Sequence, residues 1–424
     1  MSNRYLEMQS SPPLSGTVHV NGAKNAVLAM MTSLLLTRGK SLLHNVPVLT
    51  DVHYMCDVLR SLGAYVMFDT ENNQLLVDTT YVDKFHVSAE LMRKMRASVL
   101  VMGPLLARFG KAQLAFPGGD LIGARPIDFH LTNLQKMGSR VMQEDDVLHV
   151  EAPHGLRNAI CVLEYPSVGA TENIMMAASL TPGITRIVNA ALEPEVLDVM
   201  NALRTMGSRI TVLPPSTIEI EGVATLAPIE YKVMPDRLEA GSLLLAAAMT
   251  GGSITIANAQ SHVMDVFLYK LEQMGHHITC DISGLGITLQ ATDSPQAVSF
   301  TTDTYPGFPT DLQAPMMAAQ CIAQGESIIY ETVYENRLIH VRELQKMGAQ
   351  IKIVNDKAYV TGVDQLFGAN LIASDIRASC ALVLAGLIAQ GVTQVSGVDH
   401  WQRGYQDLEQ KLATLGANIV LKAS

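Results

Sequence analysis

The sequence has few aromatic residues and little charge. Aromatic residues make up 5% of the 424, with a single tryptophan at Trp401, and charged residues make up 17%. Hydrophobic residues reach 48%, which is typical of a folded, core-forming chain and excludes a disordered one. With 22 methionines, we expect helices packed with alanine, leucine and methionine rather than an aromatic-rich β-sandwich. The length favours two or three domains.

Basic residues are also in the minority. Lysine and arginine number 30 against 40 aspartates and glutamates, a formal net charge of −10. Nucleic acids and anionic membranes both select a basic face, so neither is expected as a partner. A ring of repeats encircling nucleic acid is disfavoured for the same reason. An anionic substrate has to be held by local basic residues that work against the overall field.

Cysteine is scarce and scattered. The five cysteines are odd in number and never form a CxxC pair, which indicates a reducing compartment and argues against a disulfide framework or a zinc site. They are Cys56, Cys161, Cys280, Cys321 and Cys380.

No membrane span, secretion signal or common cofactor motif is visible. The longest uncharged stretches, residues 240–264 and 378–398, begin apolar and then turn to Gly, Ser, Thr, Gln and β-branched residues. We interpret each as a buried helix followed by a strand. The first 14 residues lack the pattern of a signal peptide, so we expect a cytoplasmic protein. There is no HExxH, GxGxxG or GxxxxGK[ST] motif, so we expect no metal and no cofactor, and the ordinary nucleotide folds are excluded.

The most informative feature is an internal repeat of about 70 residues. An amphipathic run closes on glycine six times, and a second series of apolar runs ends on glycine between them. The first series is Gly63, Gly138, Gly207, Gly275, Gly348 and Gly416; the second is Gly39, Gly110, Gly183, Gly252, Gly325 and Gly391. Each unit is expected to contain a buried helix, a strand, a surface helix with a glycine C-cap, and two returning strands.

Six such units predict an α/β architecture, arranged as one ring or as two groups of three. The last unit lacks a full set of returning strands, and residues 4–20 are placed to supply one. We therefore expect two domains of three repeats, residues 22–231 and residues 1–21 plus 232–424, with the chain crossing twice. The stretch 226–233 is the expected boundary between the third and fourth units.

Several loops carry more charge and glycine than folding requires. Lys24 opens the first buried helix, where a lysine and the helix N-terminus can hold an anion together, although a solvated lysine at a cap fits as well. Residues 117–128 combine three glycines with Asp120 and Arg125, which suits a loop that changes shape over a charged substrate, or an ordinary turn.

A third group is expected at helix starts in the second half: Asp311, Asp375 with Arg377, and Arg403. An aspartate and arginines brought together can deprotonate a hydroxyl and neutralise phosphate or carboxylate. Taken singly, each also fits an N-cap or a surface ion pair. The adjacent pair His276-His277 follows a helix-ending glycine, which favours a structural role.

Taken together and in this order, these loops resemble the enolpyruvyl transferases, over nearly the whole chain from about residue 14 to residue 417. Any one motif is weak, but the set is specific. The motifs are Gly22-Ala23-Lys24-Asn25-Ala26, Met95-Arg96-Ala97-Ser98, Pro117-Gly118-Gly119, Gly123-Ala124-Arg125-Pro126, Ser167-Val168-Gly169-Ala170-Thr171, Glu193-Pro194-Glu195, Pro235-Asp236-Arg237, Phe308-Pro309-Thr310-Asp311, Glu335-Asn336-Arg337, Asp375-Ile376-Arg377-Ala378-Ser379 and Arg403-Gly404-Tyr405.

The resemblance implies a fold of two three-repeat domains, an inside-out α/β barrel, with the active site in the inter-domain cleft. Within the family it is closest to the branch that acts on UDP-N-acetylglucosamine in the first committed step of peptidoglycan synthesis. The implied reaction moves the enolpyruvyl group of phosphoenolpyruvate to the sugar 3′-hydroxyl by addition and elimination, and releases phosphate. The resemblance also implies a monomer.

The resemblance also implies roles for single residues. Asp311 is the expected base and Asp120 the expected acid, and Lys24, Arg125 and Arg403 are expected to clamp phosphoenolpyruvate. Asn25 would orient the intermediate, and Asp375 and Arg377 would support closure. The expected sugar-nucleotide contacts are Arg96, Arg125, Pro126, Ile127, Asp128, Phe129, Ser167, Val168, Gly169 and Val333.

Three positions depart from the family pattern. Asp120 stands where most members have the cysteine that fosfomycin alkylates, so the resemblance implies an active enzyme insensitive to fosfomycin. Tyr165-Pro166 replaces a lysine-containing pair, and Gln402 replaces an aspartate. These changes leave open a catalytically silent paralogue that binds the sugar nucleotide. A shikimate-pathway enolpyruvyl transferase is the alternative with the same fold.

Overall fold

The computed structural model describes residues 4–120, 122–123, 127–281 and 284–423. The chain divides into two compact units. Unit 1 comprises Met1–Asn21, Asp120–Ala124 and Pro235–Ser424, and unit 2 comprises Gly22–Gly119 and Arg125–Met234. The domain ranges expected from the repeats stay a prediction. The two units differ from those ranges at two places: residues 232–234 belong to unit 2, and residues 120–124 belong to unit 1.

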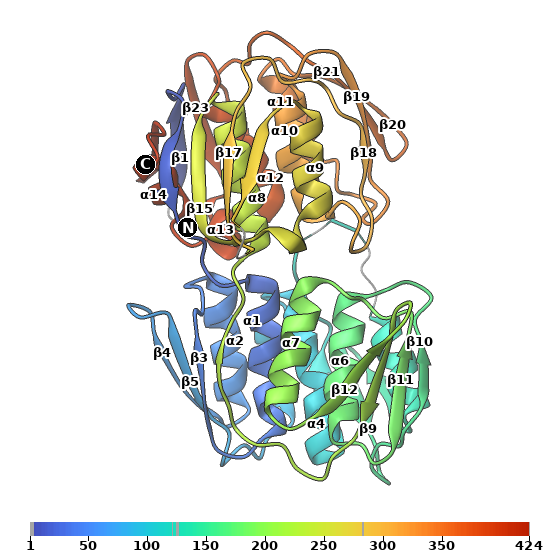
Figure 1. Cartoon of the computed structure of the whole chain (residues 1–424). Helices are drawn as coiled ribbons and strands as arrows, with labels where there is room; N and C mark the ends of the chain where they lie inside the picture. Colours follow the sequence, from blue (N-terminus) through green and yellow to red (C-terminus); the bar gives the residue numbers. More distant parts are fainter. Residues whose placement is uncertain (1–3, 121, 124–126, 282–283, 424) are drawn as a thin grey trace. The chain divides into compact units, whose positions relative to one another are not determined.

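Each unit contains three four-stranded sheets among its described residues (Figure 1). In unit 2 they are β14(Glu230–Lys232)-β3(Lys40–His44)-β5(Gln74–Asp78)-β4(Tyr65–Asp69), β6(His86–Val87)-β7(Lys111–Ala115)-β9(Val147–Glu151)-β8(Arg140–Glu144) and β10(Ile160–Val162)-β11(Ile184–Val188)-β13(Thr217–Glu221)-β12(Arg209–Leu213). In unit 1 they are β16(His277–Cys280)-β17(Leu285–Gln290)-β15(Ser253–Gln260)-β2(Ser15–Val18), β18(Phe300–Thr301)-β19(Glu326–Tyr330)-β21(Lys357–Thr361)-β20(Gln350–Val354) and β22(Asn370–Ile372)-β23(Val392–Ser396)-β1(Arg4–Gln9)-β24(Ile419–Ala423).

The helices alternate between buried and surface positions along the chain. Unit 2 has α1(Lys24–Ser33), η1(Leu34–Leu36), α2(Thr50–Ser61), α3(Ala89–Met92), η2(Arg96–Val101), α4(Met102–Phe109), α5(Asp128–Lys136), α6(Val168–Ser179) and α7(Pro194–Thr205). Unit 1 has α8(Arg237–Met249), η3(Ser261–Val263), α9(Asp265–Gln273), η4(Thr310–Leu312), α10(Gln313–Gln320), α11(Val341–Lys346), α12(Ile376–Gly386), α13(Val398–Gly404) and α14(Leu408–Thr414).

The six-fold repeat is confirmed. In every sheet one edge strand runs parallel to its neighbour and the other two pairs are antiparallel. The glycines that close the surface helices all have positive φ, from 93° to 107°. A side chain strains this left-handed conformation, which explains why glycine recurs there.

The N-terminal segment supplies strands to unit 1, as the incomplete last repeat predicts. β1 pairs antiparallel with both β23 and β24, so it fills the missing place in the last sheet. β2 adds to the next sheet as a parallel edge strand beside β15. In Figure 1 the blue strand β1 lies near β23, a strand from the last part of the chain, with which it pairs.

Both long apolar stretches form a helix and then a strand, as expected. Every residue of α8 and of α12 is buried, because a helix that is apolar on all sides needs neighbours on all sides. β15 and β23 follow them. Each unit has its own hydrophobic core, and no helix within the described residues has the length and hydropathy needed to cross a membrane.

One expected helix start is wrong. The sequence predicts that Arg403 lies at a helix start. Instead Arg403 lies in the last turn of α13, Tyr405 is extended with φ −138° and ψ 129°, and α14 begins at Leu408. The interruption buries Tyr405 and leaves Asp407 in a left-handed conformation before α14.

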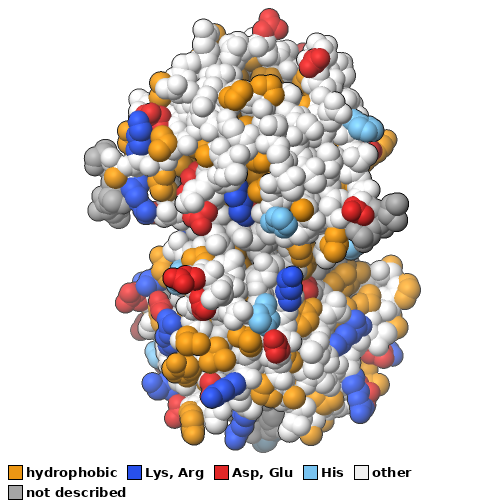
Figure 2. Space-filling view, turned by 60° about the vertical axis from the view of Figure 1, so that its left-hand side comes forward, with side chains coloured by type: hydrophobic (Ala, Val, Ile, Leu, Met, Phe, Trp, Pro, Cys, Tyr) orange, Lys and Arg blue, Asp and Glu red, His pale blue; other side chains and the backbone are white. Residues whose placement is uncertain are grey.

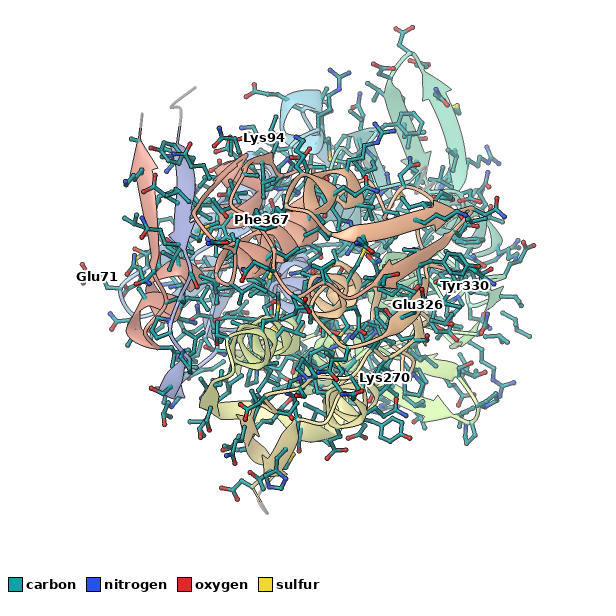
Figure 3. The ribbon with its side chains drawn as sticks, turned by 90° about the horizontal axis from the view of Figure 1, so that it is seen from above. Glu71, Lys94, Lys270, Glu326, Tyr330 and Phe367 are labelled. Carbon is teal, nitrogen blue, oxygen red and sulfur yellow. The ribbon has the colours of Figure 1, made fainter. Side chains whose placement is uncertain are left out.

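The surface offers no large basic field on the face that Figure 2 displays, where acidic and basic side chains are interspersed. The outward faces of the sheets carry mixed side chains. On β19, Glu326 and Tyr330 are both exposed, as strand alternation requires, and Figure 3 labels both side chains. Such mixed faces are typical of sheets with one solvated side.

Candidate active site

Asp120 and Arg403 meet in unit 1. Arg403 donates from a guanidinium nitrogen to Asp120 Oδ1 at 2.5 Å, and both side chains are largely buried. His400, one turn earlier on α13, places Nδ1 3.6 Å from the same oxygen, which is too long for a hydrogen bond. The structure therefore joins the expected acid to one member of the expected phosphoenolpyruvate clamp.

The loop around Asp120 is held by close packing as well as by this ion pair. Ile122 accepts a hydrogen bond at 3.0 Å from the backbone N–H of Asn336. A Cβ at Gly123 would lie 2.1 Å from a carboxylate oxygen of Glu335. In unit 2, a Cβ at Gly118 would lie 1.8 Å from the carbonyl oxygen of Arg93. Two glycines that suggested a mobile loop are thus also required by their neighbours.

Asp311 lies between two buried arginines of unit 1. Arg337 donates to Oδ1 at 2.6 Å and Arg377 donates to Oδ2 at 2.9 Å. The Asp311 side chain keeps 26% of its surface exposed, whereas the arginines keep 3% and 5%. The carboxylate is therefore fixed in orientation while one side of it stays accessible.

The charge of Arg377 is secured by this arrangement. Burial lowers the pKa of its guanidinium, but Asp311 and then Tyr405 and Asp236 raise it, and the pKa lies well above the ordinary value. Arg377 also donates to the Tyr405 hydroxyl at 3.1 Å. A cation is thus held permanently beside the expected base.

Asp375 acts as the N-cap of α12. Its Oδ1 accepts hydrogen bonds from the backbone N–H of Arg377 at 2.9 Å and of Ala378 at 3.1 Å. The guanidinium of Arg377 turns to Asp311 instead. Asp375 therefore sets the helix start from which Arg377 projects.

Val333 belongs to a turn that a buried carboxyl organises. Glu331 Oε1 accepts from the N–H of Val333 at 2.9 Å and of Tyr334 at 3.2 Å, and Thr310 donates its hydroxyl to Glu331 at 3.1 Å. Burial raises the pKa of Glu331. This residue ties the turn at Val333 to the element that carries Asp311.

Lys24 and Asn25 lie at the start of α1 in unit 2. Lys24 is buried and its Nζ lies 3.0 Å from Oδ2 of Asp51, a side chain that is 3% exposed. Asn25 is exposed. The lysine is therefore not a solvated cap but a positioned cation, with Asp51 as the counter-ion that sequence reasoning missed.

In unit 2, the expected sugar-nucleotide contacts lie at the starts of three neighbouring helical elements. Arg96 begins η2, residues 127–129 lead into α5, and residues 167–169 lead into α6. Ser167 caps α6 by accepting the N–H of Ala170 at 3.4 Å. Ile127 is buried, Asp128 is exposed and Phe129 is half-buried. The expected residues Arg125 and Pro126 lie outside the described residues.

Several residues beside these contacts were not predicted from the sequence. In the sequence, Arg337 stands out only as part of a family motif, and Asp51, Glu331 and His400 carry no signal. Asp51 and Arg337 reach Lys24 and Asp311 across other secondary-structure elements, so no local pattern marks them. Gln402 accepts from Arg4 at 3.0 Å, so this departure from the family pattern contacts β1. Within the described residues, no group of three or more histidines, cysteines and carboxylates could hold a metal.

Comparisons with known proteins agree with the fold. The enolpyruvyl transferase NikO from Streptomyces tendae superposes with a TM-score of 0.90 at 23% identity, covering 100% of both chains. An EPSP synthase from Acinetobacter baumannii superposes with a TM-score of 0.75 at 15% identity, covering 99% of this chain and 100% of that one. The fold is therefore the inside-out α/β barrel of the enolpyruvyl transferases.

The sequence comparisons are more specific. The family model described as EPSP synthase (3-phosphoshikimate 1-carboxyvinyltransferase) matches residues 8–412, so the chain belongs to the enolpyruvyl transferase family. The UDP-N-acetylglucosamine 1-carboxyvinyltransferase 1 of Caldanaerobacter subterraneus subsp. tengcongensis is 46% identical over 423 residues, covering 100% of both chains. The UDP-N-acetylglucosamine 1-carboxyvinyltransferase of Desulfosudis oleivorans is 45% identical and covers 96% of both. The chain falls among these carboxyvinyltransferases.

Proposed function

We propose that this protein transfers the enolpyruvyl group of phosphoenolpyruvate to the 3′-hydroxyl of UDP-N-acetylglucosamine and releases phosphate. The full-length identity of 46% to a carboxyvinyltransferase carries the proposal. The positioned acids and cations of the two units supply groups suited to that chemistry. Peptidoglycan synthesis in the cytoplasm, by a monomer that needs no metal or cofactor, completes the proposal.

The addition step needs a base at the hydroxyl. Asp311 is the proposed base: its carboxylate takes the 3′-hydroxyl proton as that oxygen bonds to C2 of phosphoenolpyruvate. Arg337 and Arg377 favour the ionised carboxylate, so Asp311 starts in the form that a base requires. The same two arginines make it less favourable for Asp311 to accept a proton. A substrate anion that binds either arginine would offset this effect.

Asp120 is the proposed acid that protonates C3 in the addition, and its carboxylate takes a C3 proton back as phosphate leaves. An ion pair with Arg403 favours the ionised form of Asp120, whereas an acid must carry a proton. We therefore propose that Arg403 shifts from Asp120 to the phosphate or carboxylate of phosphoenolpyruvate, since both are anions that a guanidinium fork binds well. Lys24, Arg125 and Asn25 complete the proposed contacts to that substrate.

The sugar nucleotide is proposed to bind at Arg96, residues 125–129, residues 167–169 and Val333, so that groups of both units act on one pair of substrates. Asp375 and Arg377 are proposed to support closure. Fosfomycin insensitivity is part of the proposal, because Asp120 offers a carboxylate where an epoxide needs a thiolate.

Phosphate release is the direct test. The protein is incubated with phosphoenolpyruvate alone, with UDP-N-acetylglucosamine added, and with 3-phosphoshikimate added instead. Release that depends on the sugar nucleotide supports the proposal. Release that depends on 3-phosphoshikimate supports the shikimate-pathway alternative. Binding of the sugar nucleotide without any release supports the silent paralogue, which the changes at residues 165–166 and 402 motivate.

A further inference from the structure

Three segments of unit 2 converge on one buried side chain. Asn173 of α6 is fully buried. Its Oδ1 accepts the backbone N–H of Gly103 at 2.5 Å, and its Nδ2 donates to the carbonyl oxygen of Val99 at 3.0 Å. The same Nδ2 lies 3.0 Å from Nδ1 of His130 on α5. Asn173 thus links the η2–α4 segment, α5 and α6, and the elements so joined include the three that open with proposed sugar-nucleotide contacts.

The network fixes the proton on His130. The N–H of Gly103 can only donate, so the oxygen of the Asn173 amide faces it and the nitrogen faces His130. Nδ2 then donates to Nδ1, and the neutral ring carries its proton on Nε2. Burial, and then the charge of Arg96, lower the pKa of His130 to about 3, so the ring is neutral across the ordinary pH range.

The remaining donor of the ring is directed at the start of α6. A Cβ at Gly169 would lie 3.3 Å from Cε1 and 3.5 Å from Nε2 of His130. Among the described residues, no hydrogen bond uses Nε2 of His130, although the residue is only 5% exposed. An N–H donor on a side chain that is nine-tenths buried, beside the N-terminus of a 12-residue helix, is suited to an anionic oxygen.

We propose that Asn173 is a positioning residue for sugar-nucleotide binding: it holds His130 as the Nε2–H tautomer, and His130 donates to a diphosphate oxygen at the N-terminus of α6. The inference rests on the proposed function for the identity of the ligand. It adds a neutral hydrogen-bond donor to the contacts at residues 167–169, and the buried side chain of Asn173 sets the orientation of this donor. With Tyr165 in place of the family's lysine, such a donor contributes where a cation is missing.

Two variants of His130 separate the roles of the two ring nitrogens. Glutamine places its amide nitrogen near the position of Nε2, whereas asparagine reaches only the position of Nδ1. His130→Gln is expected to bind UDP-N-acetylglucosamine within a few-fold of the unmodified protein. His130→Asn is expected to bind it about 10- to 100-fold more weakly, the range for losing one hydrogen bond to a charged group. Calorimetry with UDP-N-acetylglucosamine and with uridine measures this, and uridine binding should change in neither.

Asn173→Asp tests the tautomer itself. The carboxylate still accepts from Gly103, but it draws a proton to Nδ1. At pH 8.5 the neutral ring then presents a bare Nε2 and binding should weaken about tenfold or more. At pH 6 the carboxylate favours the doubly protonated ring, which restores Nε2–H and recovers binding. Arg96 is the charged side chain that opposes this protonation. The unmodified protein should show no such recovery, and Ser179→Ala, a buried change on the same helix, is the control for packing.

The outcomes separate the two proposals. If the unmodified protein does not bind UDP-N-acetylglucosamine, the proposed function fails. If it binds and His130→Asn binds equally well, or Asn173→Asp shows no dependence on pH beyond that of the unmodified protein, the inference alone fails. Nitrogen NMR of the free protein gives an independent reading, and an Nδ1–H tautomer at His130 would overturn the inference whatever the affinities.

Discussion

Arg403 donates to Asp120 at 2.5 Å, so the proposed acid and one of the proposed phosphoenolpyruvate cations are partners of each other. An anionic substrate that claims Arg403 frees Asp120 to take up a proton. In the proposed mechanism, binding of phosphoenolpyruvate and protonation of Asp120 would thereby be coupled through one guanidinium. The proposed coupling gives Arg403 two roles, whereas its position near a charged loop suggests only one.

Arg403→Lys keeps the charge and loses the planar fork. We expect the KM for phosphoenolpyruvate to rise about 10- to 100-fold, the range for one lost charge-assisted hydrogen bond, while the affinity for UDP-N-acetylglucosamine stays within a few-fold. Steady-state kinetics with each substrate varied in turn, together with calorimetry for the sugar nucleotide, measure the two effects. Equal weakening of both substrates would contradict this division of roles.

Asp311→Asn should reduce turnover by about 10²- to 10⁴-fold, the usual contribution of a general base, because an amide cannot accept the hydroxyl proton. The variant should keep its fold and its sugar-nucleotide affinity. Asp364→Asn, an exposed change in the same unit, is the control. Near-normal turnover in Asp311→Asn would remove Asp311 from the role of base.

Arg337→Lys tests the arginine that donates to Oδ1 of Asp311, opposite the contact of Arg377 with Oδ2. A single ammonium cannot reproduce the planar guanidinium, so Asp311 should lose its fixed orientation and kcat should fall about tenfold. In a double-mutant cycle the same change should cost little more once Asp311 is asparagine, because the two residues act as a unit. Additive losses in the double variant would show that Arg337 acts on something other than Asp311.

Much of the fold could be predicted because its signal is periodic. Glycine closes each surface helix in a left-handed conformation, so six repeats are visible in the sequence. The incomplete last repeat then predicts that the N-terminus supplies a strand, which β1 does. The start of α14 could not be predicted, since only packing decides that Tyr405 is buried rather than helical.

The candidate site was less visible. Charged residues such as Asp311 and Arg403 stand out locally, but their partners are set by long-range contacts. Asp311 and Arg337 are 26 residues apart, and Asp120 and Arg403 are 283 apart. Asn173 lies in the largely buried helix α6 and His130 in the amphipathic helix α5, and neither pattern shows which partner the polar side chain meets. The sequence therefore predicts which residues carry the chemistry, but not which partner residues orient them.

Glu172 of α6 makes stability depend on pH. It is buried, its Oε1 has no hydrogen-bond partner within the described residues, and burial, with Glu193 and Glu195 nearby, raises its pKa well above the ordinary value. A carboxyl whose folded-state pKa is raised contributes most below its unfolded pKa, and stability falls as pH rises from there toward the folded-state pKa. Glu172→Gln removes this loss.

The difference in Tm between Glu172→Gln and the unmodified protein should therefore grow in favour of the variant as pH rises from 5 to 8. A few degrees are expected, since about 1 kcal/mol shifts Tm by about 2–4 °C in a domain of this size. Glu71→Gln, at an exposed hairpin that Figure 3 places at the edge of the molecule, is the control. A difference that stays constant with pH would show that Glu172 does not titrate with the fold.

Fosfomycin tests the chemistry of position 120. The epoxide is opened by a thiolate, whereas a carboxylate is a much poorer nucleophile. Of the five cysteines, Cys56, Cys161, Cys321 and Cys380 are buried, and the exposed Cys280 lies on β16, so none stands in the loop of Asp120. We expect the unmodified protein to stay active after incubation with fosfomycin and phosphoenolpyruvate or UDP-N-acetylglucosamine.

Asp120→Cys should retain turnover and lose it rapidly on addition of fosfomycin, with a mass increase of one inhibitor on the peptide that contains residue 120. Asp120→Ala should bind the sugar nucleotide but turn over at least about 10²-fold more slowly, because it has no group to move the C3 proton. Asp120→Asn, which keeps the size and a hydrogen bond to Arg403 but cannot act as an acid, should match the alanine variant. Covalent inactivation of the unmodified protein, with label near residue 120, would overturn the argument, and so would full activity in either uncharged variant.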